Sequence, residues 1–143
     1  MAMTPLEIAK VAAAAADDKK ATDIILLDLT GISDVTDYFL ICTAQNNPQM
    51  DAVVQEIRDK VAQTSGLKPI SVEGRQRSNW IVIDYGSLVA HVFKPETRDY
   101  FRLERLWGDA PWVKLNLDGA AEEPLWKDDS SEETSRVDES ADD

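Results

Sequence analysis

One stretch of the chain, Trp80–Phe93, decides the fold class, and it reads WIVIDYGSLVAHVF. An apolar run begins at Trp80 and is interrupted only by Asp84 before Tyr85, and a second apolar run covers Leu88–Phe93. The residues at 84–87, DYGS, are typical of a tight turn because glycine and serine favour turn conformations. The pattern therefore predicts two antiparallel strands joined as a β-hairpin.

Three further strands are predicted outward from this hairpin. One short candidate, Pro69–Val72, lies before it in the sequence. Two longer apolar runs occupy Asp23–Leu29 and Tyr38–Thr43, and the first of them ends at a Thr-Gly pair that is typical of a turn. The chain is therefore expected to contain five strands.

Three helices are predicted around these strands. The first spans Met3–Lys20 and contains a Thr-Pro pair that is typical of a helix start, with Glu7 at the third helical position. The second runs through Asn47–Ser65 with apolar residues at helical spacing. The third begins at 94–96 and continues to Trp107. The predicted order is α-β-β-α-β-β-β-α, which indicates an α/β (α+β) fold with a mixed five-stranded sheet and three helices.

The charge of the chain is unevenly distributed. The formal net charge is −12 over 143 residues, and residues 118–143 carry eleven acidic against two basic side chains. Apolar periodicity stops after Trp112, so we expect one domain over residues 1–113 and an acidic, disordered tail over residues 114–143. Because residues 1–117 carry a net charge of only −3, a basic patch on the domain is expected to be able to face an anionic partner.

Cysteine content and hydropathy point to the cytoplasm. Cys42 is the one cysteine, so no intrachain disulfide is possible, which fits a reducing compartment. The apolar start of the chain is rich in alanine and contains Glu7 and Lys10, so it is too short and too weakly apolar for a membrane span. We therefore expect a cytoplasmic protein with no membrane partner.

The third predicted helix carries the most informative surface. At helical spacing, Tyr100, Leu103 and Trp107 share one face, flanked by Leu106, and this face is expected to pack on the core. The opposite face combines one aromatic ring with arginines; its residues are Arg98, Phe101, Arg102 and Arg105. Arginine and aromatic residues are enriched at protein interfaces, so this face predicts a docking surface. The alternatives are a solvated charged face, or a Phe101 covered by the segment around Trp112.

The hairpin is expected to extend this surface. Alternation places Trp80 and Asp84 on one face of their strand, and Ile81, Ile83 and Tyr85 on the other. If helices cover only one side of the sheet, Trp80 lies beside the last helix. The alternative is an ordinary core tryptophan.

The sequence offers little support for catalysis. His91 is the only histidine and stands on an apolar strand, and no CxxC, HExxH, P-loop or GxGxxG motif occurs. Asp34, Asp37 and Asp84 lie near strand ends and would suit Mg²⁺ in phosphoryl transfer, but no phosphate-binding element accompanies them. We expect no enzyme activity, metal or cofactor; the alternative is a nucleotide- or metal-binding domain.

Several motifs along the chain resemble those of a known family, the bacterial ribosomal silencing factors, also called Iojap-like or RsfS. The resemblance covers roughly residues 5–107. Its motifs are DI at 23–24, TDYFLICT at 36–43, VEG at 72–74, WIVIDYG at 80–86, HVF at 91–93, and the segment from Arg98 through LERLW at 103–107.

The resemblance implies a translational repressor. Such a protein binds the large ribosomal subunit through the large-subunit protein L-fourteen and blocks joining of the small subunit when nutrients are scarce; adjacent ribosomal RNA is a further candidate partner. It also implies a fold similar to nucleotidyltransferases without a catalytic set, and a homodimer when free. DNA is not an expected partner.

The family's docking surface, carried over by position, falls on the hairpin and the last helix. The residues so implied are Trp80, Asp84, Tyr85, His91, Arg98, Phe101, Arg102 and Arg105. Phe101 stands where relatives often have tyrosine, so a purely apolar contact is implied there. The acidic tail is not part of the shared pattern.

Overall fold

The computed structural model of the chain describes residues 3–74 and 78–123. Its elements are α1 (Pro5–Asp18), β1 (Thr22–Asp28), β2 (Tyr38–Thr43), α2 (Asn47–Ser65), β3 (Ser71–Glu73), β4 (Trp80–Asp84), β5 (Leu88–Phe93), α3 (Pro95–Phe101) and α4 (Leu103–Leu106). All five predicted strands are present, although β3 begins two residues later than expected. None of the helices in this described part of the chain is long and apolar enough to cross a membrane.

The strands form one mixed sheet in the order β1-β2-β5-β4-β3. β2 and β5 run parallel, and the other neighbouring pairs are antiparallel. The predicted hairpin is confirmed, because Trp80 pairs with Phe93 and the Tyr85 N–H donates to the Leu88 carbonyl at 2.8 Å. Gly86 in the turn has a φ of 89°, a conformation that glycine adopts at no steric cost. The predicted α+β fold with a mixed sheet is confirmed.

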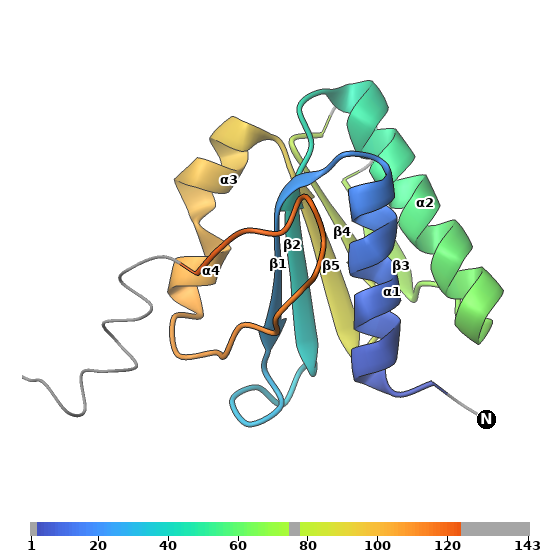
Figure 1. Cartoon of the computed structure of the whole chain (residues 1–143), viewed down its shortest axis with the longest axis vertical. Coiled ribbons are helices and arrows are strands. Elements are labelled where there is room, and N and C mark those ends of the chain that lie inside the picture. The colour runs from blue at the N-terminus through green and yellow to red at the C-terminus, as the bar shows by residue number, and fades with distance from the viewer. Residues whose placement is uncertain (1–2, 75–77, 124–143) are drawn as a thin grey trace, which may run out of the picture.

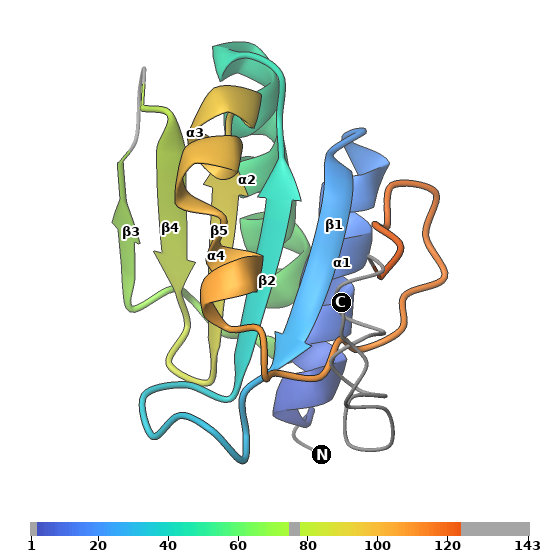
Figure 2. The same ribbon diagram turned by 90° about the vertical axis from the view of Figure 1, so that its left-hand side faces the viewer.

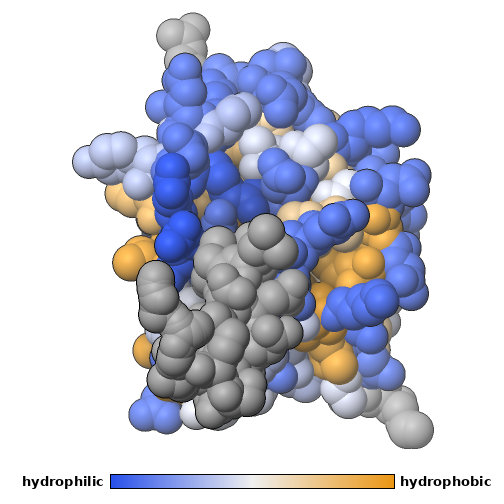
Figure 3. Space-filling view, turned by 60° about the vertical axis from the view of Figure 1, so that its left-hand side comes forward, coloured by the Kyte–Doolittle hydropathy of each residue, from blue (hydrophilic) through white to orange (hydrophobic). Residues whose placement is uncertain are grey.

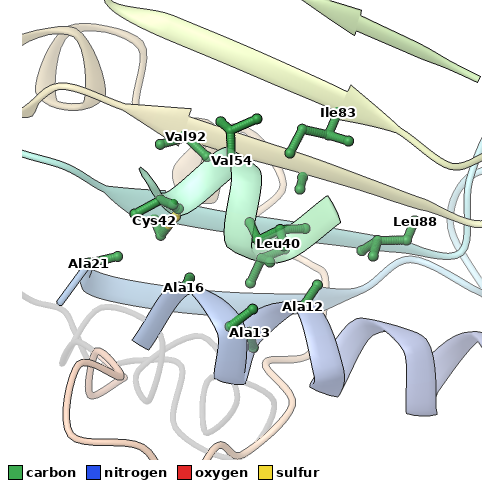
Figure 4. Packing of buried hydrophobic residues seen from close by; sticks show 14 of the residues in the cluster. Ala12, Ala13, Ala16, Ala21, Leu40, Cys42, Val54, Ile83, Leu88 and Val92 are labelled. Carbon is green, nitrogen blue, oxygen red and sulfur yellow. The ribbon is translucent and has the colours of Figure 1, made fainter. Parts of the chain in front are cut away.

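One face of the sheet is covered by α1 and α2, which lie side by side (Figure 1). Ala12, Ala13 and Ala16 of α1 are fully buried, and their small side chains allow the helix to approach the sheet closely. Figure 4 shows these alanines beside Leu40, with Val54 of α2 in the same cluster. The main hydrophobic core therefore lies between this helix pair and the sheet.

Local capping explains where the two long helices begin. The Thr4 hydroxyl accepts from the Glu7 N–H at 3.1 Å, and the Glu7 carboxylate accepts from the Thr4 N–H at 2.8 Å. This capping box satisfies two backbone donors at the start of α1, as the sequence predicted. At the start of α2, the Asn46 side chain accepts from the Gln49 N–H at 2.9 Å.

The opposite face of the sheet carries α3 and α4, which Figure 2 shows in front of the central strands. We predicted one continuous helix here, and that prediction is wrong. Arg102 adopts a left-handed conformation with φ 49° and ψ 56°, which ends α3 and redirects the chain into the short helix α4. The break changes which side chains reach the core.

A C-terminal segment lies along the outer edge of β1. The Val113 N–H donates to the Leu26 carbonyl at 2.8 Å, and the Ala121 N–H donates to the Ile24 carbonyl at 2.9 Å. Leu27 also forms a β-bridge with Trp112. We call residues 111–121 the strap. Residues 114–121 of the expected tail therefore lie along β1, whereas residues 124–143 lie outside the described residues, so the domain boundary at residue 113 stays a prediction.

Candidate docking surface

Four aromatic rings meet on the sheet face that carries α3 and α4. The Trp80 ring lies 4.9 Å from the ring of Phe93 and 4.9 Å from that of Phe101, measured between centroids. The His91 ring lies 5.9 Å from Trp80. We call Trp80, His91, Phe93 and Phe101 the aromatic platform. The predicted neighbourhood of Trp80 and the last helix is confirmed, since β4, β5 and α3 supply its members.

His91 is held in one defined state within the platform. Its Nδ1 accepts a hydrogen bond from Trp80 Nε1 at 3.1 Å, which leaves the proton of the neutral ring on Nε2. His91 Nε2 is buried and has no hydrogen-bond partner within residues 3–74 and 78–123. Burial lowers the pKa of His91 from 6.5 to about 4, so the ring is neutral near pH 7.

The outer edge of the platform is exposed and apolar. Phe101 is 40% exposed, and Tyr100 is 81% exposed with its ring perpendicular to that of Phe101 at a centroid distance of 5.0 Å. Leu106 of α4 is 72% exposed. We predicted that Tyr100 and Leu106 would face the core, and that prediction is wrong. The break at Arg102 separates α3 from α4, so Tyr100 does not share one helical face with Leu103 and Leu106. Tyr100 and Leu106 are therefore added to the candidate docking surface.

The three arginines take different roles. Arg98 is buried, and its Nη1 donates to Thr43 Oγ1 at 2.7 Å while its Nε lies 3.4 Å from Glu104 Oε1. Arg98 therefore supports the surface from beneath instead of forming it, contrary to our prediction. Arg102 and Arg105 are exposed, as expected. Arg102 Nη2 lies 3.2 Å from Asp99 Oδ1, an exposed pair of small energetic weight.

Two predicted contact residues lie elsewhere. Tyr85 points to the face covered by α1 and α2, as the alternation indicated, and it is only 8% exposed. Burial raises the pKa of the Tyr85 hydroxyl to about 12. Asp84 stands at the far end of β4 from Trp80, and its Oδ1 accepts from the Gly86 N–H at 2.8 Å. Tyr85 is thus a core residue and Asp84 stabilises the turn.

Two side chains that could take part in catalysis, Cys42 and Asp34, lie in different environments. Cys42 is fully buried, and burial raises the pKa of its thiol to about 12, so it is not a reactive thiolate. Among residues 3–74 and 78–123, no three His, Cys, Asp or Glu side chains gather in a way that would hold a metal ion. Asp34 lies in the exposed loop between β1 and β2.

The surface around the platform is divided between apolar and polar areas. Figure 3 turns the side with α3 and α4 toward the viewer, and hydrophobic surface appears on both sides of hydrophilic areas. Tyr100, Phe101 and Leu106 contribute apolar area, and Arg102 and Arg105 contribute charge. This mixture of aromatic and arginine side chains is typical of a protein interface.

Comparison with known proteins identifies the family. The profile described as "Ribosomal silencing factor during starvation" matches residues 2–143. The chain is 46% identical to "Ribosomal silencing factor RsfS" of Bacillus subtilis over 80% of this chain and 97% of that relative. It is also 31% identical to the mouse "Mitochondrial assembly of ribosomal large subunit protein 1" over 62% of this chain and 40% of that relative.

The fold agrees with the sequence comparison. A crystal structure of a protein from Chromobacterium violaceum matches with a TM-score of 0.71 and 30% identity, over 82% of this chain and 97% of that chain. The resemblance seen in the motifs is thereby confirmed: this chain belongs to the family of ribosomal silencing factors, RsfS.

Proposed function

We propose that this protein represses translation by binding the large ribosomal subunit through protein L-fourteen and sterically blocking association with the small subunit. Its family gives it a role in ribosome silencing. The name of the mouse relative refers to assembly of the ribosomal large subunit, which supports that subunit as the partner. Repression by occlusion needs a docking surface and no catalytic centre, so we propose a non-enzymatic, cytoplasmic protein that needs no cofactor.

The observation that carries this proposal is the exposed ring of Phe101. It is 40% exposed although its ring contacts that of Trp80 at a tilt of 45°, and the Trp80 indole is fixed by its hydrogen bond to His91. A rigid aromatic side chain loses little conformational entropy on binding, so it makes an efficient interface anchor. Tyr100 and Leu106 extend the apolar area next to it.

The arginines next to Phe101 complement this anchor. Both are exposed: Arg102 lies between α3 and α4, and Arg105 lies in α4. In the complex they would contact acidic side chains of L-fourteen or phosphates of neighbouring RNA. Contacts of this kind speed association and weaken with rising salt.

The proposal is tested by co-sedimentation with purified large and small ribosomal subunits. We expect the wild type to pellet with large subunits alone, and Phe101→Ala to bind at least about tenfold more weakly because a central anchor is lost. Val35→Ala is the matched control, since Val35 is 85% exposed in the loop between β1 and β2. Equal binding by all three proteins, with the fold intact by circular dichroism, would refute the proposed docking surface.

We also propose that the free protein forms a homodimer that buries part of the same surface. An exposed apolar area that includes Tyr100 and Leu106 favours self-association at high concentration. Sedimentation equilibrium of the free protein checks this point. We expect Leu106→Glu to be monomeric, and a wild type that stays monomeric at every concentration would contradict a dimer.

A further inference from the structure

The joint between α3 and α4 holds a backbone conformation that the local sequence does not favour. Arg102 at this joint has φ 49° and ψ 56°, a left-handed conformation that is costly for a residue with a Cβ. Residues 96–106, ETRDYFRLERL, contain neither glycine nor proline and include several strong helix formers. A contact outside the local backbone must therefore favour the break.

The ion pair between Arg98 and Glu104 spans this joint. Arg98 lies in α3 and Glu104 lies in α4, and their Nε and Oε1 atoms are 3.4 Å apart. On one continuous helix, residues six positions apart are separated by about 120° around the axis and by about 9 Å along it. Their side chains would point to different sides of that helix. The ion pair therefore fits the broken form and opposes the continuous one.

Burial gives this ion pair more weight than a surface pair has. The side chain of Arg98 is 9% exposed and that of Glu104 is 19% exposed. Within residues 3–74 and 78–123, neither Nε nor Oε1 has a hydrogen-bond partner, so the ion pair is the polar contact recorded for both atoms. A buried charge that loses its partner is strongly unfavourable. Straightening the helix would separate the two charges, so burial favours the break.

Arg98 is itself fixed to the sheet. Its Nη1 donates to Thr43 Oγ1 at 2.7 Å, and Thr43 is the last residue of β2 and is only 4% exposed. Figure 2 shows α3 and α4 following one another in front of the central strands. A chain of contacts therefore runs from β2 through Arg98 to Glu104, and it sets the position of α4 on the sheet.

The break decides which side of α4 faces the sheet. Leu103 is 9% exposed and packs in the same core cluster as Phe93, whereas Leu106 is 72% exposed. If α3 continued as one helix, Leu103 would lie about 140° around the axis from Arg98. Because Arg98 points toward the sheet, Leu103 would then point away from it. The break thus lets Leu103 hold α4 on the sheet and leaves Leu106 and Arg105 on the docking surface.

We propose that Glu104 is a positioning residue for docking. Through its ion pair with Arg98, it keeps the joint at Arg102 in the broken form. In this form α4 presents Leu106 and Arg105 to the partner. Glu104 acts through Arg98 and α4, since its Oε1 is buried. The effect on binding rests on the proposed function, whereas the effect on the joint concerns the free protein.

The test of binding is a double-mutant cycle in the full-length protein. Arg102→Gly and Arg102→Ala serve as two parents, and Glu104→Ala is added to each. Both parents lack the arginine side chain and differ in the preference of the joint, because glycine favours the left-handed conformation and alanine favours a helix. Affinity for large ribosomal subunits is measured by co-sedimentation.

We expect Glu104→Ala to weaken binding about tenfold in the Arg102→Ala parent and less than about threefold in the Arg102→Gly parent, where glycine keeps the break without the ion pair. Equal weakening in the two parents would indicate a direct contact or a general loss of structure and would overturn the proposal, as would no weakening in either. If Glu104→Ala does not fold, Glu104→Gln, which keeps the volume and loses the charge, takes its place with the same expected order.

NMR of the same four proteins without ribosomes reports on the joint itself. In the structure the Arg105 N–H donates to the Arg102 carbonyl, three residues earlier, at 2.9 Å. In a continuous helix the N–H groups of residues 103–105 would donate to carbonyls four residues earlier and exchange slowly with solvent. We expect Glu104→Ala to slow this exchange and to give residue 102 a helical Cα shift in the Arg102→Ala parent, with no change in the Arg102→Gly parent.

This second measurement separates the proposal from the proposed function. A wild type that does not bind large subunits would refute the proposed function, and the signals of residues 102–105 would then decide the role of Glu104. Signals that respond to Glu104→Ala in the same way in both parents, or in neither, would overturn the role of Glu104 at the joint.

Discussion

Among single side chains, His91 gives the clearest dependence on pH. Its pKa is about 4 in the folded protein and 6.5 in its ordinary state, so the unfolded chain binds more protons between these pH values. Stability that is fully present above pH 6.5 is therefore lost as the pH falls toward 4. We expect acidification from pH 7 to pH 5 to lower the free energy of unfolding through His91 by about 2 kcal/mol.

The measurement is urea denaturation at both pH values for the wild type and for His91→Gln, which does not titrate. The wild type is expected to lose more stability on acidification than the variant, because other titrating groups contribute equally to both proteins. An identical loss in the two proteins would mean that His91 is not held neutral by burial.

Arg98 is a second side chain with a testable role. Its partners Thr43 and Glu104 are both present within the fold, so Arg98→Ala leaves a mostly buried carboxylate without its counter-charge. We expect a loss of about 3 kcal/mol in the free energy of unfolding. The double variant Arg98→Met with Glu104→Leu removes both charges and is expected to be more stable than Arg98→Ala alone, as measured by urea denaturation. A double variant that is less stable would contradict this account.

The burial of Arg98 shows why sequence reasoning placed it on the wrong side. Arginine is rarely buried, so helical periodicity assigned it to the solvent. Its two partners are Thr43, 55 positions away, and Glu104, which reaches it only because the helix breaks. Neither contact leaves a signal in local spacing. Phe101 was assigned correctly to the exposed surface, because an aromatic ring among arginines is itself the signal.

Among the elements, the break between α3 and α4 has the most direct test. Arg102 is left-handed with φ 49°, and glycine adopts this conformation more readily than alanine by about 1 kcal/mol. We therefore expect Arg102→Gly to be more stable than Arg102→Ala by about that amount in thermal or urea unfolding. If the helix were continuous, Arg102→Ala would instead be the more stable variant by about 1 kcal/mol. The sign of the stability difference therefore distinguishes a broken helix from a continuous one.

The strands were predictable where the helix break was not. Alternation in Trp80–Tyr85 correctly placed Ile81, Ile83 and Tyr85 on one face, which is buried in the structure. The run Tyr38–Thr43 gave the exact bounds of β2, because an apolar run flanked by turn residues has few other interpretations. The break results from one residue, Arg102, in a rare backbone conformation. An arginine in the sequence gives no local indication of that conformation.

For the molecule as a whole, the uneven charge predicts a salt effect on ribosome binding. Residues 124–143 carry eight acidic and two basic side chains, half of the net charge of −12. Under the proposed docking beside ribosomal RNA, truncation after Glu123 removes negative charge that would repel the RNA. We expect stronger association with large subunits at low salt, and a difference that shrinks as salt rises, since screening weakens charge interactions.

Co-sedimentation at two salt concentrations measures this effect. The truncated protein is expected to keep the unfolding midpoint of the full chain, because it retains the strap. Unchanged affinity at low salt would show that the acidic residues do not influence binding. The boundary of the domain at residue 113 stays a prediction, although the packing of the strap on β1 favours a later one.

The pairing of the strap with β1 has a consequence for synthesis of the protein. Leu27 is translated early, whereas its partner Trp112 follows about 85 positions later. Until then the outer edge of β1 has unpaired backbone groups, and an open edge is a site for wrong pairing between chains. A nascent chain therefore cannot cover the outer edge of β1 until Trp112 has been made, so early termination or cleavage before Trp112 would yield molecules prone to aggregate.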